Sequence, residues 1–138
     1  MTAVPPGFPM KYVGWRLPCH PRSVSRARRL LREQVRTWHV PEEAAETAVL
    51  LFSELTSNAC KHAHASPGRE IHTLCVVEDG RLRIEVADAG EGLPQLRQAT
   101  EDDEGGRGLA LVDALADAWS ALPRPHGIGK TVWCELKY

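Results

Sequence analysis

The Asp-Gly pair at positions 79 and 80 limits the fold of this 138-residue chain more than any other local feature. Such a pair between two β-prone segments is a strong signal for a tight hairpin. The flanking segments, 71–77 and 81–87, are rich in apolar and β-branched residues. In the second segment, apolar and charged residues alternate, so one face is expected to pack and the other to stay polar. The sequence therefore predicts two antiparallel strands, and the second delivers Asp88 at its end.

Helices are expected where apolar residues recur with helical spacing. The periodic segments run over about 22–38, from Pro41 to about 63, and over about 107–117. Further strands are expected at 12–17, 119–122 and 131–137. Strands joined by tight turns, with helices that can pack on one face, predict an α+β two-layer sandwich. Its mixed, mostly antiparallel sheet would be covered on one face by three helices.

The composition is that of one ordinary globular domain, with 43% hydrophobic and 25% charged residues. We expect this domain to span 11–138 and residues 1–10 to form a disordered lead-in. The net charge of -1 does not indicate a general polyanion binder, so no direct nucleic-acid partner is expected. No apolar stretch has the length of a membrane span, and the N-terminus does not resemble a signal peptide. A cytoplasmic protein without a membrane partner is therefore expected.

The cysteines are scattered and form no C-x-x-C pair, which favours reduced and mostly buried thiols. Cys60, His62 and His64 invite a zinc interpretation. However, three ligands at positions i, i+2 and i+4 of a helix do not all share one face, and no second Cys/His pair lies nearby. Metal ligation by this cluster is not expected.

The second expected helix carries a polar group on the flank of its apolar stripe. Glu54 and Asn58 lie one helical turn apart, and Lys61 and His62 follow on the same flank. An amide oxygen is a hard ligand suited to Mg²⁺, and a carboxylate one turn away can deprotonate a hydroxyl that attacks a phosphate. Lys61 and His62 could neutralise phosphate charge. The plainer interpretation is a surface Glu with a packing Asn and a structural His62.

Two glycine-containing motifs follow. Asp88-x-Gly90-x-Gly92 offers a carboxylate that could accept the exocyclic amino group of adenine, or simply an Asp-initiated turn. Gly105-Gly106-Arg107-Gly108-Leu109 opens the third helix, where unpaired N–H groups favour anions and the glycines allow phosphate oxygens to approach closely. On its own this second motif could be a mobile loop that ends at a helix.

Together these motifs resemble the Bergerat-type ATP-binding fold of histidine-kinase catalytic domains and type II topoisomerases, over residues 12–137. The N box resembles Glu54, Asn58 and His62, the D-x-G-x-G box resembles Asp88, Gly90 and Gly92, and the G-x-G-L box resembles Gly106, Gly108 and Leu109. The closing G-x-T element resembles Gly129-Lys130-Thr131, which implies that Thr131 reaches the adenine end beside Asp88. The acidic loop from about Leu93 to Glu104 would be the ATP lid.

Within that fold the chain most resembles bacterial anti-sigma-factor serine/threonine kinases and their ATP-binding regulatory relatives. The resemblance implies Mg-ATP binding, phosphorylation of an anti-anti-sigma antagonist, sequestration of a sigma factor, and a homodimer. It implies that Glu54 is the catalytic base and that Asn58 is the Mg²⁺ ligand. The implied ATP-binding residues are Asn58, Lys61, His62, Asp88, Gly90, Gly92, Gly105, Gly106, Arg107, Gly108, Leu109 and Thr131.

Two other functions remain open. The chain could be a module that binds ATP and acts only by sequestering a partner. It could also be a small ATPase, or the partner of a separate phosphoacceptor protein. The presence of Glu54 favours the kinase, because a pure binding module needs no carboxylate beside the γ-phosphate. The arginines of segment 22–38 form either a solvated face or a surface that docks a partner.

Overall fold

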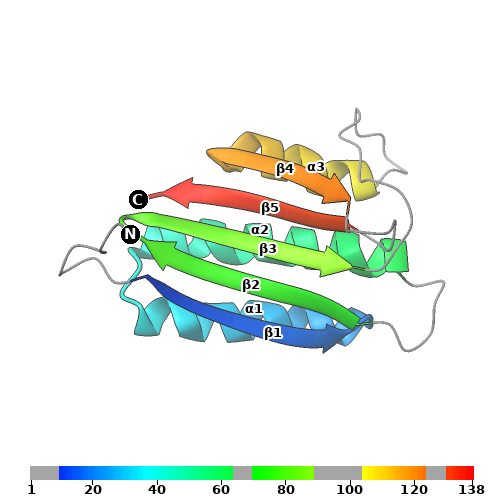
Figure 1. Ribbon diagram of the computed structural model, residues 1–138, viewed down its shortest axis with the longest axis horizontal. Coiled ribbons are helices and arrows are strands. Elements are labelled where there is room, and N and C mark those ends of the chain that lie inside the picture. The colour runs from blue at the N-terminus through cyan, green and yellow to red at the C-terminus, as the bar shows by residue number, and fades with distance from the viewer. Residues whose placement is uncertain (1–9, 64–69, 89–103, 124–129) are drawn as a thin grey trace, which may run out of the picture.

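The computed structural model describes residues 10–63, 70–88, 104–123 and 130–138. These residues form five strands and three helices (Figure 1). In chain order they are β1 (Lys11–Pro18), α1 (Pro21–Thr37), α2 (Glu42–Ala63), β2 (Glu70–Glu78), β3 (Arg81–Asp88), α3 (Glu104–Leu115), β4 (Ala118–Pro123) and β5 (Lys130–Lys137). The expected order of elements is confirmed. None of the described helices is long and apolar enough to cross a membrane.

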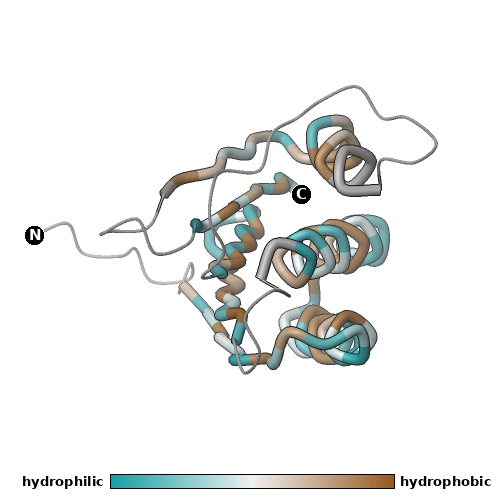
Figure 2. The backbone as a smooth tube through the Cα atoms, turned by 90° about the vertical axis from the view of Figure 1, so that its right-hand side faces the viewer, coloured by the Kyte–Doolittle hydropathy of each residue, from teal (hydrophilic) through white to brown (hydrophobic). Residues whose placement is uncertain are grey.

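The strands form a single sheet in the order β1-β2-β3-β5-β4, with the helices side by side on one of its faces (Figure 2). The expected α+β sandwich is therefore confirmed. The expected parallel component of the sheet is absent from the described ladders, because every neighbouring pair is antiparallel. The reason is the position of β5. It lies between β3 and β4, which run in the same direction, and it pairs antiparallel with both (Figure 1).

The hairpin between β2 and β3 forms as the Asp-Gly pair predicts. Asp79 and Gly80 both have positive φ, 49° and 72°, which are the signs that a type I′ turn requires. The backbone N–H of Tyr138 donates to the carbonyl of Gly80 at 2.8 Å. A Cβ atom at Gly80 would lie 2.9 Å from the Tyr138 carbonyl oxygen, so glycine is required both by the turn and by this close approach. The turn is thereby tied to the C-terminal end of β5.

A tight connection reverses the chain between α1 and α2. His39 adopts a left-handed conformation with φ 58°, and the N–H of Val40 donates to the carbonyl of Val35 at 3.0 Å. His39 N–H donates to Arg36, which completes a Schellman motif with Val35 and Val40 both buried. This geometry lays α2 beside α1, so that the C-terminal half of α2 reaches the sheet edge where β3 ends (Figure 1).

The core lies between the helices and the covered face of the sheet. Every second residue of β3 and β5 faces it, and α2 contributes the widest apolar stripe. The fully buried aliphatic and aromatic side chains include Leu31, Leu51, Phe52, Leu55, Ile71, Leu82, Ile84 and Val86. The arginines of α1 lie on its exposed side, as the expected solvated face requires.

Two buried thiols are expected to make the folded protein less stable at alkaline pH. Burial raises the pKa of Cys134 to about 12 and also raises the pKa of Cys75 above its ordinary value. Above pH 9.0, the ordinary thiol pKa, the unfolded chain releases these protons while the folded chain keeps them. We expect the free energy of unfolding to fall there by about 1.4 kcal/mol per pH unit for each thiol.

Urea unfolding at pH 7, 9 and 10 would measure this effect in the wild type and in a Cys75→Val, Cys134→Val double variant. Below pH 9 the contribution of the thiols is constant, so the two curves should run parallel there. Between pH 9 and 10 the wild type should lose more stability than the double variant. If stability changed equally with pH in both proteins over the whole range, the effect could not come from the raised pKa of the two buried thiols.

Candidate functional site

Four parts of the fold converge at one edge of the sheet. The C-terminal half of α2, the end of β3, the beginning of β5 and the beginning of α3 all lie toward the right-hand side of Figure 1. Asp88 is the last residue of β3, and Lys130 is the first residue of β5. The ladder places these two residues directly opposite each other. The topology thus gathers segments that are far apart in the sequence.

Asp88 and Lys130 form a buried ion pair at this edge. The Lys130 Nζ lies 3.3 Å from the Asp88 Oδ1, and the two side chains are 0% and 1% exposed. Each charge compensates the other, because an isolated charge in such a place would lose several kcal/mol of hydration. Sequence reasoning did not single out Lys130. Its signal was the alternation of β5, which puts residue 130 on the same face as Val132 and Cys134.

This register corrects the expectation for Thr131. Thr131 pairs with Ala87, one position away from Asp88. Because neighbouring residues of a strand face opposite sides of the sheet, the Thr131 side chain points to the side that the helices leave uncovered. The structure therefore places Lys130, and not Thr131, beside Asp88.

Glu54 and Asn58 belong to the C-terminal half of α2, which lies toward this edge (Figure 1). Glu54 is half-buried, and Asn58 is only 4% exposed. Among the described residues, the Oδ1 atom of Asn58 has no hydrogen-bond partner. An unsatisfied buried amide oxygen costs about 1–3 kcal/mol, so Asn58 Oδ1 is a candidate acceptor for a group outside the described residues. A hard oxygen of this kind fits Mg²⁺, the metal that the resemblance implies.

The structure describes only some of the remaining residues that the sequence predicts for the site. Lys61 is exposed on the last turns of α2, and the side chain of His62 lies outside the described part. Gly90, Gly92 and most of the expected lid also lie outside it. The helix α3 begins at Glu104, earlier than the expected 107, so Gly105, Gly106, Arg107 and Gly108 form its first turn instead of preceding it. The N–H groups of a first turn have no partner within the helix, which is the geometry that anions favour.

Leu109 is 2% exposed, so the structure gives it a packing position. Cys60, close to Asn58 along α2, is half-buried. Burial and the neighbouring Cys19 raise the pKa of the Cys60 thiol to about 12. The raised pKa keeps this thiol protonated at neutral pH, which disfavours it as a nucleophile.

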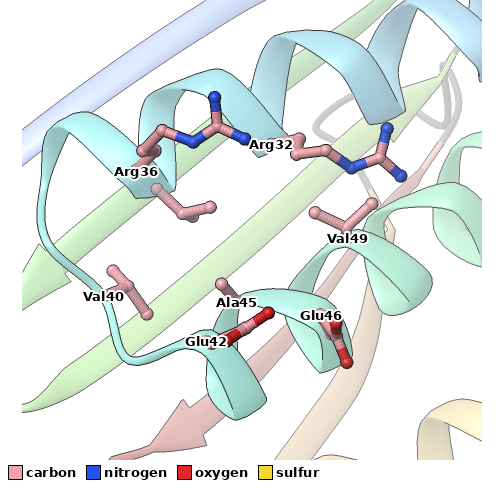
Figure 3. A pocket seen from close by; sticks show the side chains of 8 residues that line it. Arg32, Arg36, Val40, Glu42, Ala45, Glu46 and Val49 are labelled. Atoms are coloured by element: carbon pink, nitrogen blue, oxygen red, sulfur yellow. The ribbon is translucent and has the colours of Figure 1, made fainter.

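A cavity of about 540 Å³ lies between α1 and α2 (Figure 3). Its walls carry Arg32 and Arg36 from α1 and Glu42 and Glu46 from α2, above an apolar floor. It lies on the first turns of α2, three turns before Asn58. None of the expected site residues lines it, so we do not assign it to the site at the sheet edge.

Solved structures share this fold. The RsbU and RsbW domains of a Mycobacterium tuberculosis protein superpose with a TM-score of 0.69 at 21% identity, over 92% of this chain and 32% of that one. This chain thus spans about a third of that relative's length. The SiaB-SiaC complex of Pseudomonas aeruginosa gives 0.64 at 14% identity, over 91% of this chain and 89% of that one.

A blue-light activated histidine kinase of Erythrobacter litoralis gives a TM-score of 0.50 at 27% identity, over 70% of this chain and 46% of that one. No curated protein sequence matches. The family model of the histidine kinase-like ATPase domain, however, matches residues 17–134, nearly the whole of this chain. Because this match covers most of the sequence, the chain belongs to the histidine kinase-like ATPase domain family.

Proposed function

We propose that this protein is a Mg-ATP-dependent serine/threonine kinase that regulates an anti-sigma system by phosphorylating an anti-anti-sigma antagonist. The observation that carries the proposal is the buried Oδ1 of Asn58, which has no hydrogen-bond partner in the described part of the chain. Asn58 lies one helical turn from Glu54, in the half of α2 that lies toward the end of β3, where Asp88 is the last residue (Figure 1). Membership of the ATPase family supports ATP as the ligand.

Each candidate residue has its own role in the proposed function. Asp88 would accept a hydrogen bond from the adenine amino group, while N–H groups in the first turn of α3 would hold phosphate oxygens. Asn58 would hold Mg²⁺, which when bound neutralises phosphate charge. Glu54 would orient the hydroxyl group of the substrate and accept its proton. Lys61, exposed at the end of α2, could reach the same phosphates.

A protein partner is part of the proposal. The structural relative SiaB is known as a complex with SiaC, which shows that a protein of this fold associates with another protein. We propose an anti-anti-sigma antagonist as the substrate, a sigma factor as a sequestered partner, and a homodimer as the working form. The exposed arginines of α1 are a candidate docking face for an acidic partner surface.

The alternative is a regulatory module that binds ATP without transferring phosphate. The observation that favours it is Lys130, which takes the place expected of Thr131 beside Asp88. A changed adenine end is compatible with slow or absent turnover. The presence of a half-buried Glu54 at the phosphate end favours the kinase. The two possibilities differ in what the loss of Glu54 does.

Adenine recognition is tested by Asp88→Asn. The amide nitrogen would present a donor to the adenine amino group, so the affinity for ATP should fall roughly 10- to 100-fold, equivalent to about 1–3 kcal/mol. Calorimetric titration with ATP would measure this. Asp79→Asn is the matched control, because Asp79 is exposed in the hairpin turn. This control variant should bind ATP with the wild-type affinity. Unchanged binding by a folded Asp88→Asn protein would exclude the adenine assignment.

Catalysis is tested by Glu54→Ala. Since Glu54 would act only on the attacking hydroxyl, ATP affinity should stay nearly intact while phosphate transfer falls roughly 10²–10⁴-fold. Transfer of labelled phosphate to single-domain antagonist proteins of the same organism would measure the rate. Glu46→Ala, an exposed glutamate two turns earlier on α2, is the control. A wild type that binds Mg-ATP but labels no antagonist would favour the binding module.

Metal binding is tested by Asn58→Ala. This variant removes the proposed Mg²⁺ ligand, so it should weaken Mg-ATP binding itself. Titrations with and without excess EDTA separate the metal from the nucleotide. The wild type should gain affinity from Mg²⁺, and Asn58→Ala should gain much less. An equal gain in both proteins would remove Asn58 from the metal site.

A further inference from the structure

The buried Lys130 is a cation whose hydrogen-bonding capacity is only partly used. An ammonium group has three donors. Among the described residues, Lys130 Nζ makes one hydrogen bond, to Asp88 Oδ1 at 3.3 Å. The side chain is 0% exposed and lies on the same face of β5 as the apolar Val132 and Cys134. The remaining donors therefore lie at a place from which the described structure excludes bulk water.

Stability alone does not explain this pair. A buried ion pair is often no more stable than apolar side chains of similar volume at the same positions. The next pair on the same face of the two strands is Val86 and Val132, which pack as ordinary core residues. A charged pair at the one place where β3 and β5 reach the candidate site indicates a use there.

The pair also presents a specific hydrogen-bonding pattern. The carboxylate of Asp88 is an acceptor, and the ammonium of Lys130 beside it is a donor. The Watson–Crick edge of adenine carries the complementary pattern, because its amino group donates and the neighbouring ring nitrogen N1 accepts. One purine edge could therefore engage both side chains at once.

We propose that Lys130 is a base-recognition residue, which donates a hydrogen bond to N1 of adenine while Asp88 accepts from the amino group. This inference rests on the proposed function, because it requires that adenine binds at Asp88. The adenine would thus be recognised by two hydrogen bonds, one accepted by Asp88 from the amino group and one donated by the charged Lys130 to N1. Since charged donors form stronger hydrogen bonds, the contact should contribute strongly to the affinity.

The first experiment uses the wild-type protein and needs no variant. Calorimetry would compare Mg-ATP with two analogues, 1-deaza-ATP, which lacks the N1 acceptor, and purine riboside triphosphate, which lacks the amino group. Each analogue should bind roughly 10- to 100-fold more weakly than ATP. GTP should bind more weakly than ATP, because its edge reverses the order of acceptor and donor.

The second experiment repeats the series on Lys130→Met, which keeps the length of the side chain and removes the charge. This variant should bind ATP and 1-deaza-ATP with equal, reduced affinity while still discriminating against purine riboside triphosphate. Lys137→Met is the matched control, because Lys137 is exposed at the other end of β5. It should show the wild-type ratios. A purely structural role of Lys130 would lower all affinities without changing the ratio of ATP to 1-deaza-ATP.

The outcomes separate the two proposals. If the wild type binds ATP, requires the amino group and tolerates the loss of N1, Lys130 does not read the base while ATP binding at Asp88 stands. If Lys130→Met binds ATP more tightly than the wild type, Lys130 competes with the base and the inference is wrong. If the wild type binds no ATP, or binds GTP or purine riboside triphosphate equally well, the adenine site itself is wrong. Should Lys130→Met fail to fold, the analogue series on the wild type still decides.

Discussion

The packing of α2 against the middle of the sheet is the constraint on which the rest of this structure depends. Leu51, Phe52, Leu55 and Ala59 bury the inner side of the helix almost completely. Once this stripe faces β3 and β5, the position of every other residue of the helix follows from the helical period. Asn58, next to Ala59, is drawn to the edge of the core, and Glu54 follows one turn away. The site is thus positioned by the same apolar contacts that hold the layers together.

Several polar and charged side chains near this edge are buried, whereas most of the buried side chains of the core are apolar. Asp88, Lys130 and Asn58 are all nearly inaccessible, although such groups are usually exposed. The ion pair satisfies two of them in part, and the oxygen of Asn58 has no protein partner among the described residues. A core selected for stability alone would carry apolar side chains here. Buried charged side chains of this kind are candidates for a functional site.

The structural relatives establish a shared fold. The chemical activity has to be argued from the residues of the candidate site. This chain covers most of the SiaB-SiaC relative but about a third of the Mycobacterium tuberculosis protein, so the same domain occurs in different molecular settings. A fold of this kind can serve a kinase, an ATPase or a binding module. In the proposed function, the distinction between these activities depends on Glu54, and recognition of the base depends on Asp88 and its neighbour Lys130. Both are properties of individual side chains.

The sequence by itself determined the local elements, the hairpin above all. Asp79 and Gly80 adopt the positive φ angles that their residue types favour, and the alternation of β3 correctly predicts which face is buried. The helical stripes of α1 and α2 were likewise visible, because the period of a helix depends only on near neighbours. The Glu54 and Asn58 spacing belongs to the same class of local information.

Only the tertiary structure decided which distant residues meet. The insertion of β5 between β3 and β4 pairs Asp88 with Lys130, 42 positions away. It also turns Thr131 to the other face, contrary to the expectation from the motif. No local pattern specifies the register of a non-local ladder, and a shift of one residue exchanges the two faces of a strand. For that reason the motifs could name candidate site residues, whereas the identity of the residue beside Asp88 required the fold.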